Sequence, residues 1–263
     1  MNWRIHTLST GDLLLPGFHE SGDVIPTHAW ALTDGAQWVL VDSGMPSEAE
    51  MQAKWKVEAR GGGADMLRTA LAEIGVTPQQ IGMIVLTHLH FDHAWNFELF
   101  PQAQIVVQRT ELFHAIDPVP TQRIYYAKPS YLPLLDRRRP AGLRLIDGDM
   151  DLLPGLSVML APGHTPGLQV ALVNTERGTV GLVADLGEEY GAWFPADPRA
   201  TKNPSNALRG SFRPGSIRSE SELVYSGSMA RVLSRTAIVV PAHDHRIPRI
   251  MPDQWWSVPN EAL

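Results

Sequence analysis

The stretch Thr87-His88-Leu89-His90-Phe91-Asp92-His93 places four side chains that can bind metal in one short segment. It follows residues 81–86, a short apolar run rich in β-branched residues that predicts a buried strand. Residues two apart in an extended segment project to the same side, so His88 and His90 can reach one ion. If the chain then turns into a helix, Asp92 and His93 are displaced towards a second ion. The stretch therefore predicts a metal site at the end of a strand.

Further candidate ligands follow other predicted strands. Residues 179–183 lead into Asp185, residues 237–240 end near His243, and His164 lies in a Gly/Pro turn between strands at 156–160 and 170–173. The carboxyl ends of strands are where open α/β folds gather their sites. We therefore expect one cluster, in which Asp185 bridges two ions through its two oxygens while His164 and His243 complete the two ligand sets. His245 is the alternative to His243.

The remaining pattern indicates an α/β protein. The segments 29–32 and 38–41 flank an Asp-Gly turn and predict a hairpin, whose second strand ends at Asp42. Asp42 either orients a metal ligand or is a strand-end turn residue. Further elements are expected as a strand at 105–107 and helices at 64–75, 109–116 and 219–234. We expect a single domain over 1–263, with loop insertions at about 117–140 and 195–215.

Composition narrows the function. The 263 residues are 44% hydrophobic and 19% charged, which is typical of a globular protein, and the net charge of −6 disfavours a nucleic-acid partner. With no cysteine, no disulfide can form and any metal must be bound through nitrogen and oxygen. No apolar run approaches the length needed to span a membrane, and the N-terminus lacks a signal-peptide pattern, so we expect a cytoplasmic protein.

Two metal ions would serve hydrolysis directly. A water between them loses a proton near neutral pH and becomes the nucleophile, while one ion polarises the carbonyl or phosphoryl oxygen under attack. The chain has no G-x-S-x-G motif, and without cysteine it cannot use a thiol nucleophile. The sequence therefore favours a metal-dependent hydrolase.

The motif around His88 resembles the signature of the metallo-β-lactamase superfamily. The resemblance extends over nearly the whole chain, through Val41-Asp42-Ser43-Gly44, Ala161-Pro162-Gly163-His164-Thr165-Pro166-Gly167, Ala184-Asp185 and Pro241-Ala242-His243-Asp244. It implies the αββα sandwich of that family, with two metals at one edge between the sheets. The ligands it implies are His88, His90, Asp92, His93, His164, Asp185 and His243.

Within the superfamily the chain is most similar to the N-acyl homoserine lactonases, through Phe91, its length, the loop before His164 and the His243-Asp244 pair. This implies that a metal-bridging hydroxide opens a lactone ring, with Asp92 and Asp185 in catalytic roles. In that family a tyrosine three residues after the bridging aspartate assists the substrate carbonyl, but Glu188 stands there in this chain. We therefore predict Tyr190 as the assisting residue, with Tyr225, Glu188 and His28 as alternatives.

Several points remain open at this stage. The substrate is expected to be a small apolar or ring-containing molecule, because Trp95 replaces the family's usual glycine and could form an aromatic pocket with Trp193 and Phe194. Other hydrolase activities of the same fold are alternatives: a thioesterase, an organophosphate hydrolase, or an amide or β-lactam hydrolase. An iron-dependent oxygenase and a non-catalytic binding protein are further alternatives. Zinc is the expected metal, with iron, manganese or cobalt as alternatives. A homodimer is considered possible.

Overall fold

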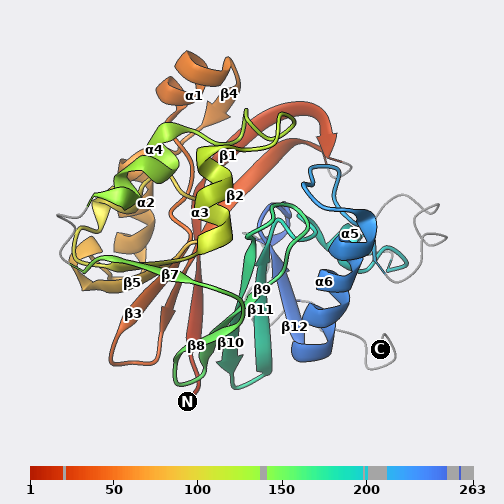
Figure 1. Ribbon diagram of the computed structural model, residues 1–263. Coiled ribbons are helices and arrows are strands. Elements are labelled where there is room, and N and C mark those ends of the chain that lie inside the picture. The colour runs from red at the N-terminus through yellow and green to blue at the C-terminus, as the bar shows by residue number, and fades with distance from the viewer. Residues whose placement is uncertain (20–21, 137–140, 198, 201–211, 248–254, 256–263) are drawn as a thin grey trace.

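The computed structural model describes residues 1–263 except 20–21, 137–140, 198, 201–211, 248–254 and 256–263. Two β-sheets face each other in the middle of the molecule, and helices cover their outer faces (Figure 1). This is the αββα sandwich that the family resemblance implied.

The first sheet has seven strands in the order β4-β1-β2-β3-β5-β6-β7. Its strands are β1 (Arg4–His19), β2 (Gly22–Thr33), β3 (Trp38–Val41), β4 (Glu58–Arg60), β5 (Ile81–Val85), β6 (Gln104–Gln108) and β7 (Leu143–Ile146). The pairs from β4 to β3 are antiparallel, whereas β3, β5, β6 and β7 run parallel. The parallel strands therefore deliver their carboxyl ends to one edge of the sheet, and the turn with His88 follows β5 at that edge.

The second sheet has five strands in the order β12-β11-β10-β9-β8. These are β8 (Met150–Leu153), β9 (Leu156–Leu160), β10 (Gln169–Thr175), β11 (Gly178–Ala184) and β12 (Ile238–Pro241). The last two pair in parallel, so Asp185 and His243, which follow them, leave the sheet at the same end. Gln169, at the start of β10, links this sheet to the first: its backbone N–H donates to Thr87 O and its side-chain amide donates to Leu86 O.

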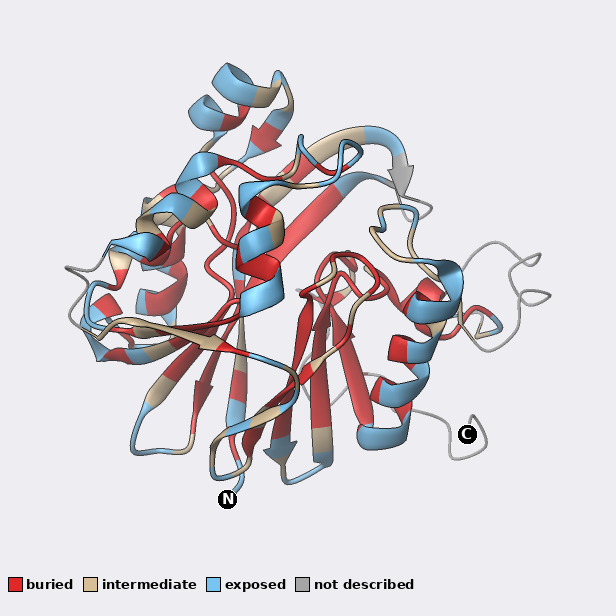
Figure 2. Cartoon of the chain, in the orientation of Figure 1, coloured by how far each residue is buried: buried red, intermediate tan, exposed pale blue. Residues whose placement is uncertain are grey.

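Alternating side chains of the first sheet build two cores, as expected from the two-residue period of a strand. Trp30 and Val85 face the second sheet in the central core, whereas Ala29 and Ile84 face outward. On that outer face lie α2 (Gly63–Glu73) and α3 (Arg109–Ile116), while α6 (Glu222–Arg235) packs on the second sheet. The sheets and the inward faces of the helices are accordingly buried (Figure 2).

The remaining helices are short. They are α1 (Glu48–Trp55), α4 (Lys128–Tyr131), α5 (Tyr190–Trp193) and the 3₁₀ turns η1 (Pro78–Gln80), η2 (Phe97–Leu99) and η3 (Leu132–Leu135). The irregular segment expected at 117–140 contains α4 and η3 within its described part. Of the insertion expected at 195–215, residues 198 and 201–211 lie outside the described residues.

Most expected elements are present. The hairpin at 29–32 and 38–41 is confirmed by β2 and β3, and the helices expected at 64–75, 109–116 and 219–234 correspond to α2, α3 and α6. The sequence patterns did not reveal the length of β1, whose Gly11 and Gly17 adopt positive φ within a strand of 16 residues.

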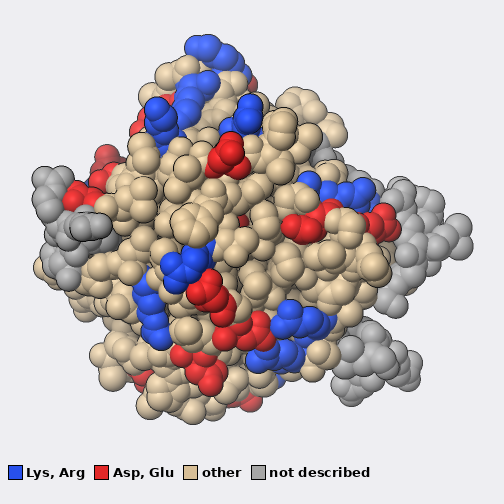
Figure 3. Space-filling view, in the orientation of Figure 1, with Lys and Arg blue, Asp and Glu red and all other residues tan. Residues whose placement is uncertain are grey.

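The surface shows no single dominant charge on the face drawn in Figure 3, where acidic and basic side chains are interspersed among uncharged ones.

Among the described residues, no helix combines the length and apolar character that a bilayer-spanning segment needs.

Candidate metal centre

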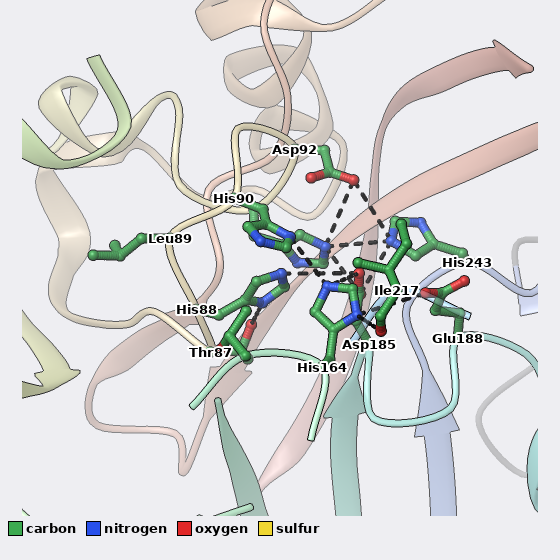
Figure 4. A network of polar contacts seen from close by, with 12 residues as sticks. Thr87, His88, Leu89, His90, Asp92, His164, Asp185, Glu188, Ile217 and His243 are labelled. Atoms are coloured by element: carbon green, nitrogen blue, oxygen red, sulfur yellow. Dashed lines mark hydrogen bonds and ion pairs between the residues drawn. The ribbon is translucent and has the colours of Figure 1, made fainter. Parts of the chain in front are cut away.

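The seven predicted ligand side chains meet at the edge where the two sheets come together (Figure 4). They form two groups, which we call the first and the second ligand group. The first contains His88, His90, His164 and Asp185, and the second contains Asp92, His93 and His243. Within each group, the ligand atoms all lie within 4.8 Å of one another. His245 belongs to neither group; its Nδ1 lies 3.9 Å from Asp244.

The motif turn divides its ligands between the groups. His90 O accepts from both His93 N and Ala94 N, so the chain makes a single tight turn after His90 rather than the helix considered above. This turn displaces Asp92 and His93 from the side of His88 and His90. The division of the motif between two groups therefore agrees with the sequence argument, although its local geometry differs.

Asp185 lies between the groups. Its Oδ1 is 3.0 Å from His93 Nε2 and 3.1 Å from His243 Nε2. Its Oδ2 faces the first group, at 3.2 Å from His164 Nε2 and 3.8 Å from His88 Nε2. One oxygen is therefore presented to each group, which is the arrangement of a bridging carboxylate.

The backbone before Asp185 is bent to achieve this placement. Ala184 has a φ of 48°, in the left-handed region that non-glycine residues seldom adopt, and the pairing of β11 with β12 is irregular at this point. The hydroxyl of Tyr225 donates to Asp185 O at 2.8 Å and accepts from Gly187 N at 2.9 Å. Burial and the nearby Glu188 raise the pKa of Tyr225, so this hydroxyl stays protonated as a donor.

The chemistry of the cluster fits metal ions. His88 Nε2 is buried without a hydrogen bond, which is costly for a polar atom unless another partner is supplied. Nitrogens also face nitrogens, at 3.0 Å between His164 Nε2 and His90 Nδ1 and at 3.3 Å between His93 Nε2 and His243 Nε2. Divalent cations bound by imidazole nitrogen and carboxylate oxygen would satisfy these atoms.

The histidine ring nitrogens that face away from the ligand cluster contact other residues. His93 Nδ1 lies 2.9 Å from Asp42 Oδ2, His243 Nδ1 is 2.8 Å from Pro26 O, and His164 Nδ1 is 3.1 Å from Ile217 O. Such contacts fix the tautomer and the ring orientation of a ligating histidine. Asp42 itself has a φ of 61° and accepts from Thr87 N and Thr87 Oγ1. Of the two roles considered for Asp42, the geometry therefore favours the orienting one.

The electrostatics of the histidines differ between the groups. Burial and the neighbouring histidines hold the pKa values of His88 and His90 well below the ordinary range. Burial also acts to lower the pKa values of His93 and His243, but nearby carboxylates, chiefly Asp185, outweigh it and raise both. Burial would raise the pKa of Asp185, yet the surrounding histidines hold it well below its usual range.

A pocket opens beside the ligands. Its apolar wall consists of Leu13, Leu15, Ile25, Phe91 and Ile217, and its polar lining includes Tyr125 and Glu188 together with His90, Asp92, His164, Asp185 and His243. The ring of Tyr125 lies 5.1 Å from that of His90. Burial, followed by the charges of Glu188 and Asp92, raises the pKa of Tyr125. Its hydroxyl therefore remains protonated at neutral pH.

Several predicted substrate contacts lie elsewhere. Tyr190 is fully buried in the central core, where its ring stacks with Phe194, so it does not line the pocket and the catalytic role predicted for it is not supported. Tyr225 donates to the backbone carbonyl of Asp185 and does not line the pocket. His28 is buried, with its Nδ1 2.6 Å from Ala242 O. Among the four residues considered for carbonyl assistance, Glu188 alone lines the pocket.

The expected aromatic pocket is also corrected. Trp193 is fully buried and donates to Gly187 O, and Phe194 belongs to the central core. Trp95 packs against Trp55 and reaches Glu50 on the outer side of the motif turn. These rings stabilise the fold around the site. Tyr125, by contrast, was not among the candidates for carbonyl assistance; its position in the irregular segment at 117–140, where substrate contacts are common, was the available signal.

Comparison with known proteins agrees with this geometry. The model of the Metallo-beta-lactamase superfamily matches residues 22–215. An N-acyl homoserine lactonase of Bacillus cereus is 31% identical over 188 residues, covering 68% of this chain and 67% of the relative. Its Bacillus thuringiensis counterpart is 30% identical over 193 residues, with coverages of 70% and 73%.

Solved structures share the fold. An N-acyl homoserine lactone hydrolase with the product N-hexanoyl-L-homoserine at its catalytic metal center superposes with a TM-score of 0.71 at 23% identity, covering 97% of this chain and 100% of the other. A hydrolase of the beta lactamase superfamily gives a TM-score of 0.62 at 17% identity, with coverages of 92% and 87%. The chain thus belongs to the metallo-β-lactamase superfamily. Its particular likeness is to the lactonases within it, and it carries His and Asp groups suited to divalent metals.

Proposed function

We propose that this protein is a dinuclear metal-dependent hydrolase that opens a lactone ring. The first ligand group would hold one ion and the second group the other, and Asp185 would contribute to both sites. The observation that carries the proposal is the orientation of the Asp185 carboxylate, with Oδ1 towards His93 and His243 and Oδ2 towards His164 and His88.

Two such ions supply an activated water and polarise a carbonyl oxygen at neutral pH. The residues of the chain contribute binding, orientation and proton transfer. Asp92 has the most exposed carboxylate of the cluster, with 12% of its side chain accessible, and it lines the pocket. Asp92 would help to hold the second ion, and its carboxylate would take a proton from the attacking water and pass it to the alcohol oxygen that leaves when the ring opens.

We assign assistance of the substrate carbonyl to Tyr125 in place of Tyr190. A residue in this role must donate a hydrogen bond towards the substrate. The phenolic hydroxyl of Tyr125 is a hydrogen-bond donor, it lines the same pocket as Glu188, and its raised pKa keeps its proton in place. In this proposal the hydroxyl of Tyr125 assists the substrate carbonyl, the role that the family resemblance gives to a tyrosine shortly after the bridging aspartate.

The substrate assignment is supported by the pocket and by the relatives. The apolar wall suits the hydrocarbon part of an acyl lactone, and the curated relatives at 30–31% identity are named N-acyl homoserine lactonases. A thioester, a phosphotriester, an amide or a β-lactam is the alternative substrate for the same centre. Zinc is the metal we expect, since imidazole and carboxylate ligands suit it.

The proposal is tested by removing and restoring the metal. Chelator-treated protein should lose turnover of N-acyl homoserine lactones and regain it with two equivalents of Zn²⁺, measured by metal analysis and by titration of the acid released. Parallel assays on a thioester, a phosphotriester and a β-lactam rank the alternatives. Absence of lactone turnover in protein loaded with two ions would exclude the lactonase assignment.

The role of Tyr125 is tested by Tyr125→Phe. Loss of one donor to the developing oxyanion should lower kcat roughly 10²- to 10³-fold with little change in KM. Tyr131→Phe, in the same irregular segment but outside the pocket, is the matched control and should retain full activity. An unchanged kcat in Tyr125→Phe rules out the assignment.

A further inference from the structure

A buried carboxylate outside the two ligand groups connects the turns that carry the first group. Glu111, in the first turn of α3, is fully buried and accepts four hydrogen bonds. Its Oε1 accepts from Leu89 N at 2.9 Å and Tyr126 Oη at 2.8 Å, and its Oε2 accepts from Thr165 Oγ1 at 2.6 Å and Gly167 N at 3.2 Å. These contacts use the full acceptor capacity of a carboxylate.

The donors lie beside the metal ligands. Leu89 stands between His88 and His90, and its side chain points away from the cluster (Figure 4). Its backbone N–H donates to Glu111 Oε1. Thr165 directly follows His164. One turn follows β5 of the first sheet, and the other joins β9 to β10 of the second. Glu111 is therefore bonded to both sheets at the point where their ligands meet.

The packing at this point is close. A Cβ added to Gly167 would lie 2.3 Å from Glu111 N and 2.5 Å from its Cα. The glycine thus allows the turn with His164 to lie directly against the backbone of α3. Two further side chains hold the same turns: Ser130 Oγ donates to Leu89 O at 2.9 Å, and Gln122 Nε2 donates to His164 O at 2.5 Å.

We infer that Glu111 is a positioning residue that sets the separation between the His88–His90 turn and the His164 turn. Two of its donors, Leu89 and Thr165, directly adjoin ligands of the first group in the sequence, whereas none of the four adjoins a ligand of the second. This inference rests on the proposed two-metal site. Glutamine in place of Glu111 has the same shape but presents an amide NH₂ to donors that need an acceptor, so it should loosen the first group and spare the second.

The experiment measures binding of Co²⁺ to metal-free protein by its visible absorption and by competition with a chelator. We expect Glu111→Gln to weaken one of two binding constants roughly 10- to 100-fold and to leave the other within about threefold. His243→Ala, which removes a ligand of the second group alone, identifies which constant belongs to which group. Glu73→Gln, an exposed change on α2, is the matched control and should alter neither constant.

The outcomes separate this inference from the proposed function. Wild-type protein that binds fewer than two Co²⁺ ions overturns both. Two wild-type sites with both constants unchanged, or equally weakened, in Glu111→Gln overturn the inference alone. If Glu111→Gln does not fold, Thr165→Val removes one of the four donors at constant shape: selective weakening of the first site supports the inference, and its absence refutes it.

Discussion

Asp185 lies between the first and second ligand groups, but different parts of the molecule hold the two groups in place. The turns of the first group are bonded by side chains of α3 and the segment after it, namely Glu111, Gln122 and Ser130. The histidines of the second group are held by Asp42, at the end of β3, and by the carbonyl of Pro26 in β2. The first support lies on the outer layer of the sandwich, and the second lies within the sheet.

The two ligand groups also differ in the pKa values of their histidines. The histidine pKa values are lowered in the first group, at His88 and His90, and raised in the second, at His93 and His243. Burial lowers the histidine pKa values in both groups, but at the second group it is outweighed by carboxylates, chiefly Asp185 and then Asp92. The two halves of one site are therefore built by different means: neutral imidazoles held by the outer layer, and imidazoles paired with carboxylates from the sheet.

The largest effect is expected when Asp185, which lies between the two ligand groups, is replaced. Asp185→Ala should abolish lactone turnover, by at least about 10³-fold in kcat/KM, because both groups lose a ligand. Metal analysis after dialysis should show loss of both ions. Retention of one ion would show that the groups are independent and that the carboxylate does not bridge them.

The next effect concerns a buried histidine beside the second group. Burial lowers the pKa of His28 from 6.5 to about 4. The unfolded chain therefore protonates this histidine at a higher pH than the folded protein does. The stability that His28 contributes is fully present above pH 6.5 and is lost as the pH falls towards 4. His28→Asn keeps a donor for Ala242 O without a titrating ring. The free energy of unfolding of metal-free protein should therefore fall less between pH 6.5 and 4 in the variant, by up to about 3 kcal/mol. Parallel curves for the two proteins would contradict the shift.

A smaller effect should follow from loosening the second group. Asp42→Asn replaces an acceptor of His93 Nδ1 by a group of the same shape, and it should weaken binding of the second ion roughly 10- to 100-fold. Asp151→Asn, at an exposed position of β8, is the control. Equal weakening of both ions would mean that the contacts of Asp42 with Thr87 transmit the change to the first group.

The smallest expected effect is at Trp95. Its ring packs against Trp55 outside the pocket, so Trp95→Ala should change kcat/KM on a lactone less than about threefold while lowering the free energy of unfolding by about 1 kcal/mol. Thermal unfolding and steady-state kinetics measure the two quantities separately. A large change in substrate preference would show that this side of the motif turn shapes the pocket after all.

The sequence was informative where short patterns determine local geometry. Strand-end positions of His88, Asp185 and His243 indicated one cluster, because parallel strands deliver their ends to one edge. The division of the ligands into two groups also followed from the spacing within the motif. The fold class came from the family resemblance and agrees with the two sheets and their covering helices.

The residues that surround the ligands were harder to predict, because their contacts join distant parts of the chain. Glu111 contacts Thr165, 54 positions away, and nothing in the pattern of α3 marks that side chain as buried. Tyr190 was predicted as a substrate contact because it lies close to Asp185 in the sequence, whereas the fold brings Tyr125 to the pocket. Sequence neighbours of a ligand are not always its spatial neighbours.

The order of the ligands along the chain has a consequence for biosynthesis. A chain that folds as it leaves the ribosome presents its N-terminal parts first. The first group is complete once Asp185 has emerged, whereas the second needs His243, which follows α6 and the parallel strand β12. The side chains of the second group can therefore come together only after β12 has been synthesised, later than those of the first group.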